Sequence, residues 1–284
     1  MTFKLGVIGF PISQSISPAF QQAALDHMGI DAHYELWETT PNQLVQRVTE
    51  LRSNGSLGFN VTVPHKEAIF GLLDGASPEA QSIGAVNVVV REGDQLVGYN
   101  TDAIGFLRAL REEAGFDPKG LHVLVLGAGG AARAVCFALI QAEVSRLSIT
   151  NRTDARAHAL VAALSAENTN MNVVQMDKTT LAGVIYSTPP VKLIVNCTSL
   201  GMRHGLNAEV SPLASDLLPF DIFIYDLIYN PPQTPLLKVA RSKGAMTLGG
   251  LSMLVYQGAE AFRLWTGLEP PVNVMREAAE QALK

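Results

Sequence analysis

Short apolar runs alternate along the chain with longer stretches in which apolar side chains recur every three or four positions. The runs have the length of buried strands, and the longer stretches have the spacing of amphipathic helices. This alternation favours an α/β architecture with parallel strands. Strands are expected at 4–9, 33–38, 59–63, 123–126, 146–150, 172–176, 192–197 and 223–229, a hairpin at 85–100, and helices at 17–28, 41–51, 66–75, 103–114, 234–244, 253–267 and 274–284.

The best candidate for a domain boundary is the segment Gly115–Gly120, which separates two series of such elements. Beyond it, residues 121–152 have the pattern of a compact strand, turn, helix and second strand. A chain of 284 residues is long enough for two ordinary domains. We therefore expect two α/β parts rather than one continuous core.

The turn after the strand 123–126 carries the sharpest local motif, "VLVLGAGGAARAV". Gly127, Gly129 and Ala132 have the spacing G-x-G-x-x-A. In dinucleotide-binding folds the first position allows a tight turn, the second allows close approach of a pyrophosphate, and the third allows close packing of helix on strand. Glycines also form ordinary turns, but here a strand precedes and a helix follows the motif. The pattern predicts dinucleotide binding.

The residues that end the strand 146–150 indicate which dinucleotide binds. NAD sites place a carboxylate about 20 residues after the glycines, where it binds the ribose hydroxyls. This chain has Asn151, Arg152 and Thr153 there, with Arg156 one turn later. A guanidinium suits a 2′-phosphate, so the pattern favours NADP over NAD. The alternative interpretation, in which Arg152 only solvates a loop, remains open at this stage.

Several polar residues interrupt apolar stretches before the boundary. Each has an ordinary explanation: Ser17 and Asp102 can cap helices, and Lys66 can be a surface lysine in a turn. Polar groups that cluster at the ends of successive strands nevertheless suggest a binding cleft. A lysine beside an aspartate would suit general acid–base chemistry. The residues in question are Ser15, Ser17, Thr62, Lys66, Asn87 and Asp102.

Composition narrows the class of protein further. The chain is 48% hydrophobic and 17% charged, with a net charge of −5, which argues against a nucleic-acid partner. The N-terminal segment does not resemble a signal peptide, and no apolar run approaches the roughly 18 residues of a membrane span. Two cysteines, Cys136 and Cys197, do not make a disulfide framework, so a reducing, cytoplasmic location is expected.

The motifs together resemble those of the shikimate dehydrogenase family over nearly the whole chain. The motifs are "GFPISQSISP", "FNVTVPHKEA", "IGAVNVVV", "GYNTDAIGF", "VLGAGGAARA", "ITNRT", "NCTSLGM", "YDLIYNPPQTPLL" and "GLSMLVYQGAEAF". The resemblance implies a substrate-binding α/β domain, an NADP-binding Rossmann domain and a cleft between them. The substrate-binding domain would comprise 1–105, with 249–284 returning to it, and the Rossmann domain 106–248.

The resemblance also implies a role for each matching residue. Lys66 and Asp102 would be the catalytic pair, with Lys66 moving the proton of the C3 oxygen. Ser15, Ser17 and Tyr229 would bind the substrate carboxylate, and Thr62, Asn87 and Gln257 would hold its hydroxyl groups. The cofactor would contact Gly127, Ala128, Gly129, Gly130, Ala131, Asn151, Arg152, Thr153, Arg156, Thr198, Leu227, Gly250 and Met253.

The implied reaction is the reversible NADPH-dependent reduction of 3-dehydroshikimate to shikimate, in the biosynthesis of chorismate and the aromatic amino acids. It requires neither a metal nor a covalent intermediate, and the expected protein is a monomer or homodimer with small-molecule partners only.

His65 is expected to be a turn or surface histidine, and Cys197 a packed residue rather than a nucleophile. Two alternatives remain: a quinate or dual shikimate/quinate dehydrogenase using NAD(P), and a non-catalytic NADP-binding sensor. The segment 203–212 matches none of these motifs.

Overall fold

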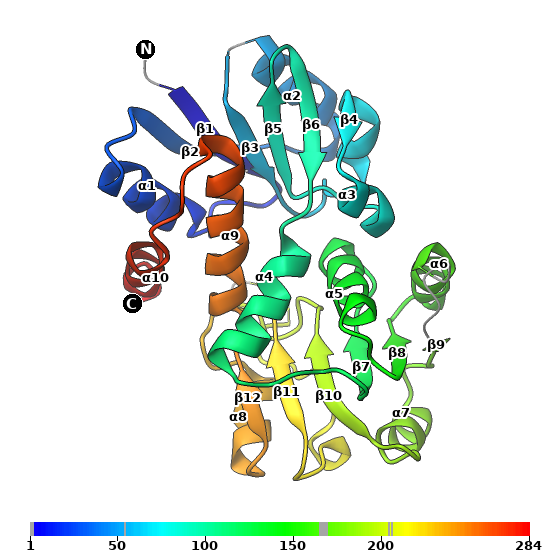
Figure 1. Cartoon of the computed structure of the whole chain (residues 1–284). Coiled ribbons are helices and arrows are strands. Elements are labelled where there is room, and N and C mark those ends of the chain that lie inside the picture. Colours follow the sequence, from blue (N-terminus) through cyan, green and yellow to red (C-terminus); the bar gives the residue numbers. More distant parts are fainter. Residues whose placement is uncertain (1–2, 54, 165–169, 204, 206) are drawn as a thin grey trace. The chain divides into compact units, whose positions relative to one another are not determined.

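The computed structural model describes residues 3–53, 55–164, 170–203, 205 and 207–284. The chain divides into two compact units, one made of 1–105 with 255–284 and the other of 106–254. Each unit contains its own six-stranded sheet (Figure 1). Two helices contribute residues to both units, α4 (Asp102–Arg108) and α9 (Leu251–Thr266).

The first unit has a mixed sheet in the order β2-β1-β3-β5-β6-β4. β1, β2 and β3 are mutually parallel, whereas β5 runs antiparallel to both β3 and β6. The hairpin turn between β5 and β6 contains Gly93 at φ 63°, a conformation that glycine adopts without strain. The strands are β1 (Phe3–Gly9), β2 (Ala32–Glu38), β3 (Gly58–Val61), β4 (Gly75–Ala76), β5 (Val88–Glu92) and β6 (Gln95–Tyr99), and the helices that belong wholly to this unit are α1 (Ser17–His27), α2 (Leu44–Ser53), α3 (Pro78–Ile83) and α10 (Val272–Gln281).

The second unit has an entirely parallel sheet in the order β12-β11-β10-β7-β8-β9. This is the doubly wound order, in which the strand sequence reverses between β7 and β10. The strands are β7 (His122–Leu126), β8 (Arg146–Thr150), β9 (Met171–Val173), β10 (Val191–Asn196), β11 (Phe223–Asp226) and β12 (Met246–Leu248), and the helices are α5 (Gly130–Gln141), α6 (Asp154–Leu164), α7 (Lys178–Ile185) and α8 (Pro235–Ser242).

The core of the second unit explains why its strands are almost continuously apolar. Every residue of β7 is buried, as expected for a central parallel strand that is covered on both faces. Leu124 and Ile194 of two neighbouring strands pack in one buried cluster with Leu181 of α7 and Leu237 of α8. Burial of these side chains holds the carboxyl ends of the strands in register, and the loops that carry polar residues follow those ends.

Several expected elements differ from the structure. The helix expected at 66–75 is a short 3-10 helix, Ala68–Leu72, so Lys66 lies in a turn rather than in a first helical turn. Ser17 is the first residue of α1 and its side chain does not cap the helix. Thr62 directly follows β3 instead of lying within it. The segment expected as strand 172–176 is a shorter strand, β9.

Two short helices escaped prediction because they span fewer than three turns. α3 has clear local signals: the Ser77 hydroxyl accepts a hydrogen bond from Ala80 N, and Gly84 ends the helix at φ 70°. α7 is capped by Asp177, whose carboxylate accepts from Thr180 N.

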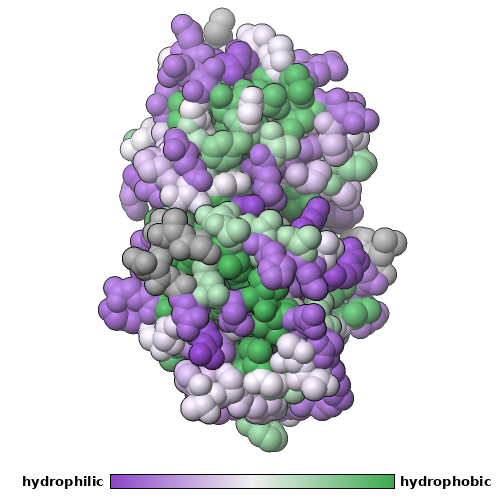
Figure 2. All heavy atoms as spheres, turned by 90° about the vertical axis from the view of Figure 1, so that its right-hand side faces the viewer, coloured by the Kyte–Doolittle hydropathy of each residue, from purple (hydrophilic) through white to green (hydrophobic). Residues whose placement is uncertain are grey.

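Among the described residues, no helix combines the length and the apolar character that a membrane crossing requires. The face shown in Figure 2 carries hydrophilic side chains with apolar ones scattered between them.

His122, at the start of β7, makes the stability of the second unit depend on pH. Its ring lies between Ser148 Oγ (2.9 Å) and Pro189 O (3.0 Å) and is 2% exposed. Burial lowers the pKa of His122, so the fold favours the neutral ring. The stability contributed by His122 is therefore present above the unfolded pKa of about 6.5 and lost as pH falls through the lower folded value.

We expect the unfolding midpoint to fall more steeply between about pH 7 and 5 in the wild type than in His122→Gln, which cannot be protonated in this range. Thermal unfolding monitored by circular dichroism at both pH values tests this. Equal slopes for the two proteins would show that another group carries the acid sensitivity.

Candidate active site

The first unit gathers its polar residues at one edge of its sheet. Thr62 follows the end of β3, and Asp102 comes shortly after the end of β6. Asn87 precedes β5, which runs antiparallel to both of those strands, so its start lies at the same edge. The sheet order therefore brings together three residues that are far apart in the sequence.

A buried ion pair forms the centre of this edge. The Lys66 ammonium donates a hydrogen bond to Asp102 Oδ2, with side-chain exposures of 14% for the lysine and 5% for the aspartate. Asp102 Oδ1 accepts a second hydrogen bond from Asn87 Nδ2 at 2.9 Å. Opposite charges held in a largely desolvated setting interact far more strongly than an exposed surface pair. The pair is thus fixed in place and still partly open to solvent through the lysine.

Asn87 organises the groups around the pair. Its Nδ2 lies within hydrogen-bond distance of Thr101 Oγ1 (3.0 Å), Asp102 Oδ1 (2.9 Å) and Gln257 Oε1 (3.2 Å). An amide has only two N–H donors, so one of these three contacts is shared or yields to a ligand. Asn87 Oδ1 accepts from Thr101 N at 2.7 Å, and Thr101 Oγ1 donates to Gln257 O at 3.0 Å. The network is polar, buried and almost fully paired.

Lys66 reaches the pair because the chain turns sharply after β3. His65 N donates to Thr62 O, which closes the turn, and Val86 N donates to Lys66 O. The His65 ring is 1% exposed and its Nε2 lies 2.6 Å from Thr39 O. Of the two alternatives expected for His65, a turn or a surface histidine, the structure agrees with the turn and excludes the surface, since the ring is buried. Its ring is engaged by the backbone and not aimed at the lysine.

The serines follow β1 at the same edge of the sheet. Ser15 Oγ donates to Ser17 Oγ at 3.1 Å, and Ser17 N lies 3.3 Å from Ser15 Oγ. Ser15, Ser17 and Thr62 are all half-buried. Two linked hydroxyls at a strand end can donate to an anionic oxygen, which is the chemistry that a carboxylate requires.

The second unit gathers the other predicted residues at the carboxyl edge of its parallel sheet. Loops leave this edge after β7, β8, β10, β11 and β12. Ligands of doubly wound sheets bind outside this edge, at the point where the strand order reverses. The predicted cofactor residues in these loops are Gly127, Ala128 and Gly129; Asn151, Arg152 and Thr153; Thr198; Leu227; and Gly250.

The glycine turn after β7 has the geometry that its spacing predicts. Gly127 adopts φ 110°, and a Cβ there would lie 3.2 Å from the backbone carbonyl of Cys197 and 3.3 Å from Thr198 Cγ2. Gly129 precedes α5 as its N-cap residue, and a Cβ there would meet nothing within 4 Å. The space above Gly129 is thus available for an anion that approaches the N-terminus of α5.

This difference between the two glycines gives a test. We expect Gly129→Ala to fold with unchanged stability but to raise the KM for NADPH about tenfold, because the new methyl occupies the space that the pyrophosphate needs. Gly127→Ala, the matched variant, should instead lower the unfolding midpoint, since its φ is strained for alanine. Unchanged NADPH kinetics in a folded Gly129→Ala protein would remove the pyrophosphate assignment.

The loop after β8 presents two cations to solvent. Asn151 Nδ2 donates to Thr153 O at 2.9 Å, and Arg156 N donates to Thr153 O, so the turn into α6 is well ordered. Arg152 and Arg156 are both exposed, and neither side chain forms an ion pair with another described residue. Two exposed guanidinium groups in a loop at the carboxyl edge of this sheet suit a phosphate monoester.

Gly250 packs against the loop after β11. A Cβ at Gly250 would lie 2.0 Å from Leu227 O, so only glycine fits. Gly250 N donates to Ile228 O, which fixes this contact. Met253 is buried in α9, and Tyr229 is half-buried in the same loop as Leu227. The structure therefore brings Leu227 and Gly250 together within the second unit.

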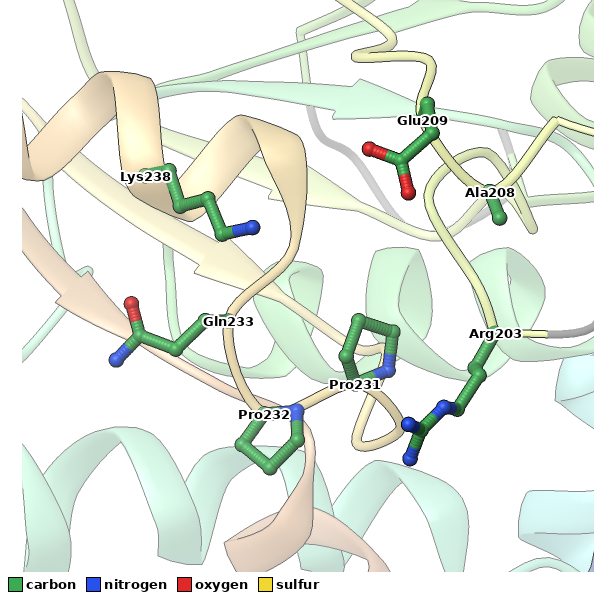
Figure 3. A pocket seen from close by; sticks show the side chains of 7 residues that line it. All are labelled: Arg203, Ala208, Glu209, Pro231, Pro232, Gln233 and Lys238. Carbon is green, nitrogen blue, oxygen red and sulfur yellow. The ribbon is translucent and has the colours of Figure 1, made fainter.

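A surface cavity of about 350 Å³ also lies in the second unit, and none of the predicted site residues lines it. In Figure 3, Lys238 and Glu209 reach toward the same space from opposite sides, while Gln233 points away from it. Arg203 and Pro231 complete the wall. Two positions of the unassigned segment 203–212, 204 and 206, lie outside the described residues. The mixed charges of the cavity indicate no particular ligand.

Several buried polar residues near the two edges are not evident as site residues from the sequence. Thr101 was not among the predicted site residues, yet it completes the Asn87 network. Asn60 links Tyr34, whose hydroxyl donates to Asn60 Oδ1 at 2.6 Å, to the Asn87 carbonyl at 3.1 Å. Asp226 lies within the apolar run 222–228. For Asp226, the signal in the sequence was a polar residue inside an apolar strand.

The fold and the two edges define the class of this protein: a two-unit α/β protein with a Rossmann-type dinucleotide-binding sheet. Family models match three segments of the chain: the shikimate dehydrogenase substrate binding domain at residues 7–89, shikimate / quinate 5-dehydrogenase at 110–205, and the shikimate 5′-dehydrogenase C-terminal domain at 250–280.

Individual proteins are similar over the full length. The chain is 44% identical to a shikimate dehydrogenase (NADP(+)) of Geobacter metallireducens, covering 100% of this chain and 98% of that one. The crystal structure of shikimate 5-dehydrogenase from Thermus thermophilus, a complex with NADP(H) and shikimate, is 41% identical with a TM-score of 0.86, covering 99% of this chain and 100% of that one. Quinate dehydrogenase from Corynebacterium glutamicum, a complex with NAD, is 32% identical with a TM-score of 0.88, covering 99% of each chain. The chain belongs to the shikimate dehydrogenase family.

Proposed function

We propose that this protein is a shikimate dehydrogenase, which reduces 3-dehydroshikimate reversibly to shikimate with NADPH in the biosynthesis of chorismate and the aromatic amino acids. The single observation that carries the proposal is the buried Lys66–Asp102 pair, held by Asn87 at the polar edge of the first unit. A pair of this kind can supply the proton that reduction of a carbonyl requires. Membership of the family supplies the substrate class.

NADPH, when bound, supplies the hydride that adds to the C3 carbonyl carbon. Lys66 donates a proton to the C3 oxygen and becomes a neutral amine, which solvent reprotonates. Asp102 keeps the lysine at the reacting oxygen and stabilises its charged form. In the direction of oxidation, the neutral amine accepts the hydroxyl proton. Because the two N–H groups of Asn87 face three acceptors, Asn87 can bind a substrate hydroxyl without breaking the whole network.

The remaining substrate contacts are proposed from chemistry and family resemblance. Ser15 and Ser17 would bind the carboxylate with their hydroxyls, and Tyr229 of the second unit would contribute a third hydroxyl. Thr62 and Gln257 would hold ring hydroxyls beside Asn87. Most of the proposed substrate residues thus lie in 1–105 and the C-terminal segment from 249, and most of the proposed cofactor residues lie in 106–248; the exceptions are Tyr229, Gly250 and Met253.

The cofactor is proposed to lie along the carboxyl edge of the second sheet. Gly127, Ala128, Gly129, Gly130 and Ala131 would surround the pyrophosphate at the N-terminus of α5. Asn151, Arg152, Thr153 and Arg156 would bind the adenosine end with its 2′-phosphate, and Thr198, Leu227, Gly250 and Met253 would contact the nicotinamide end. The open space at Gly129 and the available guanidinium groups suit NADP. We also propose a cytoplasmic location, because the two cysteines are not joined in a disulfide, which suits a reducing compartment.

A second candidate is a quinate or dual shikimate/quinate dehydrogenase that uses NAD. The observation that favours this second candidate is the similarity of the chain to a quinate dehydrogenase. Arg152 argues for NADP, and the intact Ser15–Ser17 pair argues for shikimate. A non-catalytic sensor would need neither Lys66 nor Asp102, so their association argues against that class. These functions are separated by the rates at which the purified protein oxidises NADPH and NADH, each measured with 3-dehydroshikimate and with dehydroquinate.

A further inference from the structure

Asp226 is a buried carboxylate to which the proposed reaction assigns no task. It is the last residue of β11, at the carboxyl edge of the second sheet, and is 0% exposed. Burial raises the pKa of its carboxyl, and hydrogen bonds from three donors oppose that rise. A charged group is costly to bury, so its retention at the cofactor edge requires an explanation.

Three donors from three segments converge on this carboxylate. Asn196 Nδ2, at the end of β10, donates to Oδ1 at 2.9 Å, and Ile228 N, in the loop after β11, donates to Oδ1 at 3.2 Å. Thr234 Oγ1 donates to Oδ2 at 2.6 Å and accepts from Leu237 N, so it also caps α8. Only a carboxylate accepts at both oxygens.

The segments tied to Asp226 carry the residues proposed for the nicotinamide end. Asn196 Oδ1 accepts from Thr198 N (3.0 Å) and from Thr198 Oγ1 (2.7 Å), so Asp226 fixes the asparagine that places Thr198. Leu227 lies between Asp226 and Ile228, and Ile228 O accepts from Gly250 N. One buried group thus connects the loops after β10, β11 and β12.

We propose that Asp226 is a positioning residue for the cofactor: its carboxylate sets the relative places of Thr198, Leu227 and Gly250 and thereby the affinity for NADPH. This inference rests on the proposed function in that NADPH is taken as the ligand. Asp226 itself acts through Asn196 and Ile228. An asparagine at this position would present an N–H to the Thr234 hydroxyl, whose own proton would then lose its acceptor.

The decisive comparison is between Asp226→Asn and Ser148→Ala. Ser148 is an equally buried residue of the same sheet, but its hydroxyl bonds His122 at the start of β7 and Asn172 of β9, not the cofactor loops. Both variants lose a buried hydrogen bond and should lower the unfolding midpoint. Only Asp226→Asn should weaken NADPH binding, by about tenfold.

The measurement is the Kd of the full-length protein for NADPH, by titration calorimetry well below the unfolding midpoint, together with the KM for NADPH and for 3-dehydroshikimate. We expect a higher Kd and a higher KM for NADPH in Asp226→Asn, with the KM for 3-dehydroshikimate and the kcat at saturating NADPH within about twofold of wild type. Thr234→Val removes one hydrogen-bond donor and leaves the carboxylate, so it should raise the Kd for NADPH less than Asp226→Asn does. It is the variant to measure if Asp226→Asn does not fold.

A purely structural role would appear as equal NADPH Kd values for wild type, Asp226→Asn and Ser148→Ala despite lowered midpoints, and would overturn the inference. For Thr234→Val the same result, a lower midpoint with an unchanged Kd, also counts against it. Failure of the wild-type protein to bind NADPH at all would instead contradict the proposed function, so the two failures are distinguishable.

Discussion

Replacement of Lys66 by alanine is expected to lower kcat by about 10²–10⁴, the usual contribution of a positioned general acid. The physical reason is that no other described group is joined to Asp102 in an ion pair at this edge, so the C3 oxygen would take its proton from water. The KM for shikimate should change only a few-fold, because the substrate contacts proposed for Ser15, Ser17 and Asn87 would remain. Steady-state rates of shikimate oxidation and dehydroshikimate reduction check both expectations.

The control for Lys66→Ala is Lys119→Met, which removes an exposed lysine that pairs with Glu143 on the surface of the second unit. Its kcat should equal that of the wild type, because exposed ion pairs contribute little. Added methylamine should restore part of the activity of Lys66→Ala, since a small amine can take the place of the missing ammonium. A kcat within about tenfold of the wild type, with no response to methylamine, would exclude the acid–base role.

Replacement of Arg152 by alanine is expected to raise the KM for NADPH by about 10- to 100-fold while changing the KM for NADH about twofold or less. Hydrogen bonds to charged groups contribute about 1.5–3 kcal/mol, and a 2′-phosphate is the group that distinguishes the two cofactors. Arg152 is exposed and the turn around it is held by Asn151 and Thr153, so its removal should not disturb the fold. Initial rates with each cofactor at saturating 3-dehydroshikimate give the comparison.

Arg111→Ala serves as the matched control, because Arg111 is an exposed arginine of the same unit that forms an ion pair with Asp117, away from the cofactor loops. Both KM values should be unchanged in this variant. If Arg152→Ala raised both KM values equally, the side chain would bind a part common to NADPH and NADH. The 2′-phosphate would then have to be assigned to Arg156 or to another group.

Features that depend on residues adjacent in the sequence could be predicted from the sequence. The glycine turn after β7 needs a strand, two small residues and a helix in immediate succession, and all of these are visible in 123–141. The same holds for the hairpin around Gly93. Hydrophobic periodicity also identified most strands, because parallel strands covered on both faces must be continuously apolar.

Features that depend on sheet order could not be predicted from the residues alone. Lys66 and Asp102 are 36 positions apart, and they meet because β3, β5 and β6 are neighbours in the order found. Their pairing was an expectation from family resemblance rather than from pattern. The burial of His65 was missed for the same reason, since its partner is the distant Thr39 carbonyl. Asp226 was missed because its three donors come from separate segments.

We propose that Lys66 and Asp102 supply the proton, and that the glycine turn after β7 binds NADPH, in the reduction of 3-dehydroshikimate. The most direct test is kcat/KM of the wild-type protein for shikimate and for quinate, each with NADP and with NAD. We expect the highest value for shikimate with NADP, by at least about tenfold over every other combination, because the loss of one hydrogen bond to a charged group produces discrimination of this size. A preference for quinate with NAD, or no activity with any combination, would contradict it.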